Sequence, residues 1–160
     1  MGKIESEVKM PEKFRKAVFI VTYIRTEKGI KYLILKRKLH WRGWEFPKGG
    51  VKKDENIENA IKREVKEETG LEIKGKIKKF DFHGSYKYKR NYSSRPEYSG
   101  QSFSLYAVET FWKKVKVDNR EHSAYKWLSF NDALKKITFE NQKKSLKIVN
   151  NWLENEKNKS

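Results

Sequence analysis

A helix predicted between Asp54 and Gly70 carries acidic residues on its apolar face, and no other feature of the sequence constrains the fold as strongly. Four apolar residues at helical spacing define that face: Ile57, Ala60, Ile61 and Val65. At a rotation of about 100° per residue, Glu64 and Glu68 fall within the same arc. Asp54 is the expected N-cap and Gly70 the expected C-terminal stop. A core packed against this helix must therefore contain carboxylates.

Carboxylates that are buried together repel one another and lose hydration, so they need a cation or several hydrogen-bond donors. The alternative is a solvated helix held by Glu–Lys pairs, but Lys62 and Lys66 point away from the acidic arc. Arg63 and Glu67 lie one turn apart at its edge, close enough for a charge-assisted hydrogen bond. Oxygen ligands favour Mg²⁺ or Mn²⁺. The chain has no cysteine, so a metal must be held by oxygen or histidine.

The length and charge of the chain predict one domain that attracts polyanions. The 160 residues show no linker, so 1–160 is expected to form a single domain with flexible ends at about 1–12 and 155–160. No signal peptide or membrane-spanning run is evident, which predicts a cytoplasmic protein without a membrane partner. The net charge of +17 favours nucleotides, RNA or polyphosphates as ligands, although surplus lysine also maintains solubility. A monomer or small homo-oligomer is expected.

The remaining pattern predicts an α/β sandwich with a mixed β-sheet. Six segments rich in β-branched and aromatic residues are predicted strands: 14–24, 31–38, 44–46, 73–88, 101–110 and 125–128. The pair Gly49 and Gly50 predicts a loop, and so does the polar segment 89–100. Ser129 begins a capping signal with Asp132. A C-terminal helix is marked by Phe139, Leu146, Val149 and Leu153.

The segment around the acidic helix resembles the Nudix box. Gly49 is followed after five residues by Glu55 and after seven more by the run REVKEETGL, which begins at Arg63 and ends in Gly70 and Leu71. The strand–loop–helix context also fits. The resemblance implies an α/β/α sandwich and a Mg²⁺- or Mn²⁺-dependent hydrolase that cleaves a nucleoside diphosphate linked to another group.

The resemblance also implies roles for individual residues. Glu64, Glu67 and Glu68 would hold metal or activate water, with Glu64 the first choice as general base and Glu67 the second. Arg63 would orient Glu67, while Glu55 and Gly70 would support the loop and the helix end. The backbone carbonyl of Lys48 would be a further metal ligand. Glu121 matches a position at which relatives supply another acidic ligand or base, and an ordinary loop glutamate is the competing interpretation.

Segments on both sides of the box resemble particular branches of the family. Residues 44–50 (WEFPKGG) are similar to diadenosine tetraphosphate hydrolases and to RNA 5′-pyrophosphohydrolases, and residues 121–128 are similar to the tetraphosphate hydrolases. The resemblance implies that Phe139, or less strongly Tyr106, stacks on adenine, although either can be a core residue. The basic candidates for contact with a polyphosphate chain are Lys36, Arg37, Lys38, His40, Arg42 and Lys48, with Lys48 the first choice. The histidines, including His122, lack metal-site spacing and are expected to be polar surface residues.

Three functions remain open from the sequence. The resemblance favours hydrolysis of diadenosine tetraphosphate to ATP and AMP. Segment 85–103 interleaves tyrosines with lysines and arginines, a pattern that holds single-stranded nucleic acid, so RNA 5′-pyrophosphohydrolase activity is the alternative. A Nudix domain that binds nucleotides or RNA without catalysis is the third, and the intact box counts against it.

Overall fold

A computed structural model describes residues 13–89 and 97–157 of the protein. The strands are β1 (Phe14–Thr26), β2 (Gly29–Arg37), β3 (Gly43–Glu45), β4 (Lys48–Gly50), β5 (Ile73–Lys87), β6 (Gly100–Thr110) and β7 (His122–Leu128). The helices are α1 (Ile57–Thr69), α2 (Phe130–Lys136) and α3 (Glu140–Lys157). In this described part, no helix is long and apolar enough to cross a membrane.

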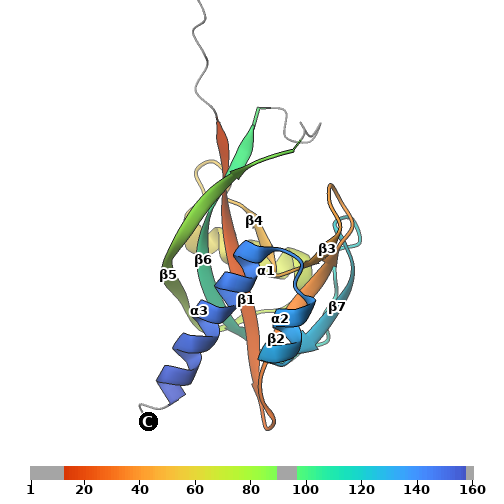
Figure 1. The fold of residues 1–160 in the computed structure, drawn as a ribbon, viewed down its shortest axis with the longest axis vertical. Coiled ribbons are helices and arrows are strands. Elements are labelled where there is room, and N and C mark those ends of the chain that lie inside the picture. The colour runs from red at the N-terminus through yellow and green to blue at the C-terminus, as the bar shows by residue number, and fades with distance from the viewer. Residues whose placement is uncertain (1–12, 90–96, 158–160) are drawn as a thin grey trace, which may run out of the picture.

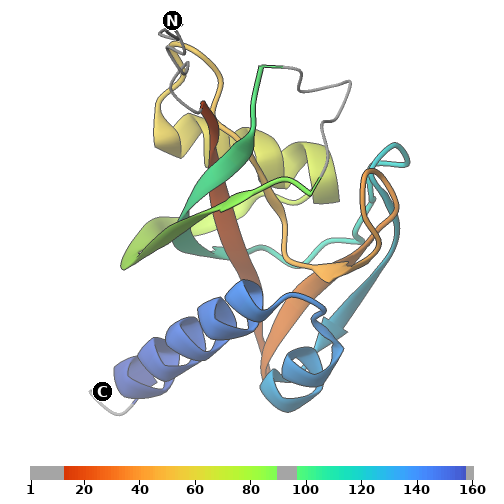
Figure 2. The same cartoon turned by 45° about the horizontal axis from the view of Figure 1, so that its top comes forward.

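The sheet is mixed, as the sequence predicted. Its order is β3-β2-β1-β6-β5, with β4 also paired to β1 and β7 to β2. The central strand β1 runs antiparallel to β2 and parallel to β6, whose register joins Phe14 to Gly100 and Tyr23 to Glu109. Helices α2 and α3 lie on one side of the sheet and α1 lies on the other (Figures 1 and 2). The predicted α/β/α sandwich is therefore confirmed.

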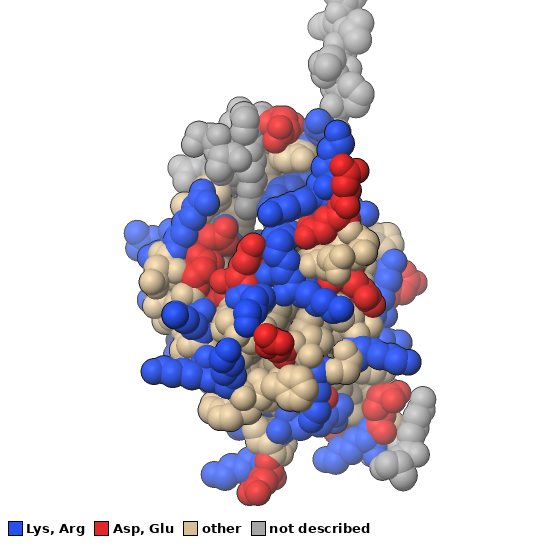
Figure 3. All heavy atoms as spheres, turned by 180° about the vertical axis from the view of Figure 1, so that it is seen from behind, with Lys and Arg blue, Asp and Glu red and all other residues tan. Residues whose placement is uncertain are grey.

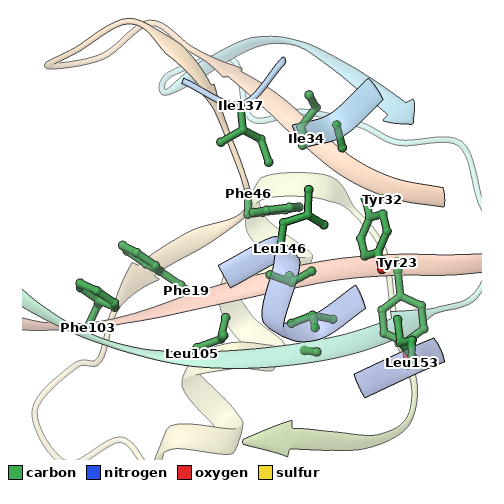
Figure 4. Packing of buried hydrophobic residues seen from close by; sticks show 14 residues of the cluster. Phe19, Tyr23, Tyr32, Ile34, Phe46, Phe103, Leu105, Ile137, Leu146 and Leu153 are labelled. Atoms are coloured by element: carbon green, nitrogen blue, oxygen red, sulfur yellow. The ribbon is translucent and has the colours of Figure 1, made fainter. Parts of the chain in front are cut away.

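Strand alternation divides the core into two clusters, because successive side chains point to opposite faces. Phe19, Phe103 and Leu105 belong to the cluster beneath α2 and α3, where Leu146 and Leu153 of α3 also pack (Figure 4). The second cluster lies beneath α1 and contains ten buried residues: Val18, Ile20, Leu33, Leu35, Ile61, Val65, Leu71, Tyr106, Val108 and Val115. The acidic helix is thus anchored by its apolar residues to one face of the sheet.

The N-terminus of α1 differs from the prediction. The N-cap is Asn56, whose side-chain oxygen accepts a hydrogen bond from the Asn59 N–H at 2.8 Å. Asp54 instead has a positive φ of 65° in the preceding turn, a conformation that Asp tolerates better than most residues. The prediction of Asp54 as the N-cap is therefore wrong; Asp and Asn are both typical caps, so residue type alone does not distinguish the two positions. Gly70 ends the helix as predicted, at φ 75°.

The glycine pair lies in a strand, so the prediction of a loop there is wrong. Gly49 and Gly50 belong to β4 and pair with Val18 and Ala17 of β1. A Cβ on Gly49 would collide with the Glu64 carboxylate, and one on Gly50 would collide with the Arg15 guanidinium. Glycine here permits close approach of a strand to charged side chains, a role that cannot be distinguished from a turn in one sequence.

The C-terminal region also differs in detail. The last strand begins at His122 rather than Tyr125, and Ser129 caps the short helix α2, which is separate from α3. Phe139 lies just before α3, and its carbonyl accepts the N–H groups of Gln142 and Lys143. Helix α3 continues to Lys157, so 155–157 are helical. Residues 1–12, 158–160 and most of the predicted loop 89–100 lie outside the described residues.

Candidate active site

Arg63 is the centre of the hydrogen bonds that join α1 to the strands. Its guanidinium donates to both oxygens of Glu55, at 2.8 and 2.9 Å, and to the Gly50 carbonyl at 2.9 Å. It also donates to Glu64 at 2.7 Å and Glu67 at 3.2 Å. Hydrogen bonds from Arg63 are the main reason that the pKa of Glu55 falls to about 2. Arg63 therefore fixes the loop and two box carboxylates together, including the predicted contact with Glu67.

The three box glutamates differ in exposure. Glu68 is 2% exposed and accepts the Lys48 backbone N–H, 3.3 Å from each of its oxygens. The Glu64 side chain is 12% exposed and that of Glu67 is 55% exposed. Burial raises the pKa of both Glu68 and Glu64, and neighbouring carboxylates add to the effect, most strongly at Glu68. This confirms the prediction that carboxylates share the buried face of α1.

A second buried carboxylate, Glu45, has many donors. Arg37 and His122 contact one of its oxygens at 3.2 and 3.0 Å, and Trp41 donates to the other at 3.1 Å. The Lys48 ammonium lies 3.7 Å away. Burial alone would raise the pKa of Glu45, but the charge of Lys48, the hydrogen bond from His122 and the charge of Arg37 lower it to about 2.

His122 is fully buried, so the expectation of a polar surface histidine is wrong. It contacts Glu45, which is 77 residues away in sequence. No local sequence pattern predicts a contact over that separation. One atom each of Glu68, Glu121 and His122 lie within 4.8 Å of one another. Arg37 also reaches Glu121 at 3.4 Å.

The chemistry of this donor set fits a divalent cation. Burial raises the pKa of Glu64 and of Glu68, and the charges of neighbouring carboxylates, including Glu121, add to the rise at both. Clustered carboxylate oxygens suit Mg²⁺ or Mn²⁺. The residues that would hold such an ion are Glu68 and Glu121, with Glu64 and Glu67 beside them. The predicted ligation by the Lys48 carbonyl remains a prediction.

Two cavities meet at this site. The smaller, called the acidic cavity, has a volume of about 80 Å³ and is polar. Nine residues line it: Arg15, Arg37, Trp41, Lys48, Gly49, Glu64, Glu67, Gln101 and Glu121. The larger, called the aromatic cavity, has a volume of about 310 Å³ and has mainly aromatic and basic walls. It is lined by Phe19, Trp41, Lys48, Tyr86, Lys87, Tyr88, Lys89, Phe139, Asn141 and Gln142. Trp41 and Lys48 line both cavities. A ligand with a ring at one end and phosphates at the other matches this shape.

The predicted substrate contacts are brought together only in part. Phe139 and Lys48 line the larger cavity. Tyr106 is buried in the cluster beneath α1, on the opposite sheet face from the Phe139 cavity. Lys38 and Arg42 are exposed and line neither cavity. Of the predicted substrate-binding residues Lys48, Phe139, Tyr106, Arg42 and Lys38, the structure therefore places two, Lys48 and Phe139, at the larger cavity.

Besides Glu45 and His122, three residues of the site were not anticipated from the sequence: Trp41, Arg15 and Gln101. Trp41 lies 4.4 Å, ring centroid to cation, from both Arg37 and Lys48. Arg15 donates to Gln101 at 3.2 Å, and the Gln101 amide also bonds Tyr86 and Tyr88. The position of Trp41 among basic residues just before the box could have indicated that it belongs to the site. Arg15 and Gln101 gave none, because they meet only through the parallel β1–β6 register.

The comparisons with known proteins agree with this geometry. The model of the NUDIX domain matches residues 13–147, so the chain belongs to the Nudix family and is a hydrolase of acid anhydrides. The asymmetrical bis(5′-nucleosyl)-tetraphosphatase of Rattus norvegicus is 30% identical over 124 residues, which cover 78% of this chain and 81% of that protein.

Other relatives carry different names. The RNA pyrophosphohydrolase of Hahella chejuensis is 29% identical over 104 residues, covering 59% of this chain and 65% of that protein. The chain therefore spans about two thirds of the length of that relative. A C. elegans Ap4A hydrolase in a binary complex is similar in fold, with a TM-score of 0.69 and 24% identity, covering 88% of this chain and 98% of that chain. The names of these relatives all describe hydrolases, but they give different substrates.

Proposed function

We propose that this protein hydrolyses a phosphoanhydride bond of a dinucleoside polyphosphate, with diadenosine tetraphosphate cleaved to ATP and AMP, in the presence of Mg²⁺ or Mn²⁺. One observation carries the proposal: the acidic cavity opens beside an aromatic cavity, and Trp41 and Lys48 line both. The aromatic cavity fits a nucleobase, and the acidic cavity fits metal-bound phosphates. The rat tetraphosphatase and the C. elegans Ap4A hydrolase support this substrate class.

The chain's own residues would bind and orient such a substrate. Phe139 offers a ring for the base, and the basic side chains Lys48, Lys87 and Lys89 lie at the same cavity for the phosphates. Arg37 lines the acidic cavity, and its buried Nη2 has no hydrogen-bond partner among residues 13–89 and 97–157. That donor suits a phosphate oxygen. Buried Glu68 and half-exposed Glu121 would hold the cation.

Glu64 is the proposed general base. Its Oε1 accepts from Arg63, and Oε2 accepts no hydrogen bond from the described residues, so Oε2 is the atom that would take the proton from water. Because burial raises its pKa, Glu64 is a stronger proton acceptor than an exposed carboxylate. A bound divalent cation would screen the phosphate charge and acidify the attacking water. Glu67, more exposed and also held by Arg63, is the second choice.

RNA 5′-pyrophosphohydrolase activity is the second candidate. The aromatic cavity is edged by Tyr86, Lys87, Tyr88 and Lys89, a basic and aromatic run that suits a nucleotide chain continuing outward. A relative named RNA pyrophosphohydrolase supports the same activity. A domain that binds without catalysis is less well supported, because the box carboxylates are all present and Arg63 contacts three of them, Glu55, Glu64 and Glu67.

Product analysis separates these candidates. The protein would be incubated with Mg²⁺ and either diadenosine tetraphosphate or triphosphorylated RNA, and products would be resolved by chromatography. We expect ATP and AMP from the dinucleotide at a higher kcat/KM than pyrophosphate or phosphate from RNA. Preferential cleavage of RNA would favour the second candidate. Binding of both without cleavage would contradict catalysis.

A further inference from the structure

An exposed aromatic pair lies at the end of β6, away from the acidic cavity. Phe111 is 54% exposed and Trp112 is 72% exposed, the largest values for big apolar side chains among the described residues. The β1–β6 register places Arg15 of the acidic cavity against Gln101, at one end of the strand pair, and Tyr23 against Glu109 near the other end. At about 3.3 Å per residue, the aromatic pair is roughly 30 Å from Arg15. The proposed reaction does not use it.

A groove of about 540 Å³ accompanies the two rings. It is lined by Ile24, Arg25, Thr26, Lys74, Glu109, Thr110, Phe111 and Trp112. The Lys74 ammonium lies 5.8 Å from the centre of the Phe111 ring. The Trp112 ring is 6.3 Å from Trp127, centroid to centroid, at an angle of 47°. One ring is thus supported by a cation and the other by a second indole, while both keep exposed surface.

Positive charge predominates around the rings. Lys113 and Lys114, which follow Trp112 directly, are both exposed. The negative charge of Glu109 is paired with Arg25 at 3.3 Å. Lys74, Lys113 and Lys114 therefore give the surroundings of the rings a local excess of positive charge. Seen from behind, the face that carries α1 shows many more Lys and Arg than Asp and Glu side chains (Figure 3). The charge of the whole chain, +17, has the same sign.

We propose that the Phe111–Trp112 surface binds single-stranded polynucleotide. Bases would stack on the two exposed rings, and phosphates would contact Lys74, Lys113 and Lys114. Flat rings next to lysines provide the two contacts that such chains need, stacking and backbone neutralisation. A second copy of this protein is a poorer occupant, because its like charge would be repelled. Two rings are also far from the roughly 800 Å² per partner of a stable interface.

Binding of a fluorescein-labelled oligonucleotide tests the surface. Anisotropy would be measured for wild type and for the Phe111→Ala/Trp112→Ala variant, with oligouridylate in one arm and oligothymidylate in the other. We expect affinity to fall at least about tenfold in the variant, because each stacked base is lost. Hydrolysis of diadenosine tetraphosphate should stay within about twofold of wild type. Preference for one oligonucleotide identifies whether RNA or DNA is the ligand.

Charge variants provide a matched control. Lys113→Ala/Lys114→Ala and Lys144→Ala/Lys147→Ala remove the same charge, the second pair from exposed positions on α3. Only the first should weaken binding strongly and reduce the slope of log K against log salt by about 1.4. Equal losses in the two variants, or unchanged affinity in the aromatic variant, would overturn the proposal. So would sedimentation showing a wild-type dimer that the aromatic variant abolishes.

Discussion

Glu45 and Glu68 are both buried, but their surroundings differ in charge. Glu45 is fully buried and is contacted by Arg37, His122, Trp41 and Lys48. Glu68 is 2% exposed, and among residues 13–89 and 97–157 its hydrogen bonds come from one backbone N–H, that of Lys48. The pKa of Glu45 falls to about 2, whereas that of Glu68 rises well above its usual value because burial and neighbouring carboxylates disfavour the charged form.

The difference separates a structural carboxylate from one that needs a ligand. When a buried charge has matched donors, removing one partner destabilises the protein strongly because the other is left buried and unpaired. A buried charge with few donors destabilises the protein until a cation binds. Glu45 and Glu68 are therefore expected to have opposite effects on the free energy of unfolding.

Glu64→Gln should have the largest effect. The amide cannot take a proton from water, so kcat should fall about 10³-fold with little change in the unfolding free energy. Steady-state hydrolysis of diadenosine tetraphosphate measures the first quantity and urea denaturation the second. Glu154→Gln, at an exposed position on α3, is the control and should leave both unchanged. Near wild-type kcat for Glu64→Gln would transfer the role of base to Glu67.

Glu45→Gln should lower the free energy of unfolding. Loss of this charge leaves Arg37 buried without its full partner, which costs about 3–5 kcal/mol. Urea denaturation in EDTA would measure the change, again beside Glu154→Gln. A cost below about 1 kcal/mol would mean that the Arg37–Glu45 pair contributes little, and the contrast with Glu68 would be lost.

Acid should affect the two carboxylates in opposite directions. The folded-state pKa of Glu45 is below its ordinary value of 4.5, so its stabilisation is present above 4.5 and is lost as the pH falls toward 2. Between pH 5 and pH 3 that loss is about 2 kcal/mol, and Glu45→Gln should lack it. The folded-state pKa of Glu68 is raised, so its cost grows as the pH rises above 4.5. Denaturation at several pH values in EDTA would measure both effects. Identical plots of unfolding free energy against pH for wild type and Glu45→Gln would refute the lowered pKa of Glu45.

Trp41→Phe should have the smallest effect. It keeps a ring between the cavities but removes the indole N–H that donates to Glu45 at 3.1 Å. The expected cost is about 1.5 kcal/mol in unfolding free energy, because the lost hydrogen bond has a charged acceptor. Stability equal to wild type would show that the remaining donors satisfy Glu45 alone.

The sequence predicted the acidic face of α1 well because that face depends on local periodicity. The positions of Glu64, Glu68 and Arg63 follow from about 3.6 residues per turn and from the recognisable spacing of the box. The Glu45 network was not predictable in the same way. Glu45, His122 and Arg37 come from three strands, and their contacts depend on how β2 pairs with both β3 and β7.

Glycine and tyrosine positions show the same limit. Gly49 reads as a turn residue, but the structure requires it because the Glu64 carboxylate packs where a Cβ would be. Tyr106 and Leu105 are adjacent in β6 and face opposite clusters. Strand alternation predicts that the two side chains point to opposite faces of the sheet, but not which one points to the face beneath α2 and α3.

Unfolding of wild type and Glu68→Gln, each in EDTA and in saturating Mg²⁺, tests the central claim most directly. In EDTA the variant should be as stable as wild type or more stable, because a poorly compensated buried charge is gone. Mg²⁺ at about 100 times its Kd should stabilise wild type by about 2.7 kcal/mol and the variant far less, so the order of stability reverses. A variant that is less stable in EDTA and gains as much from Mg²⁺ as wild type would contradict the account.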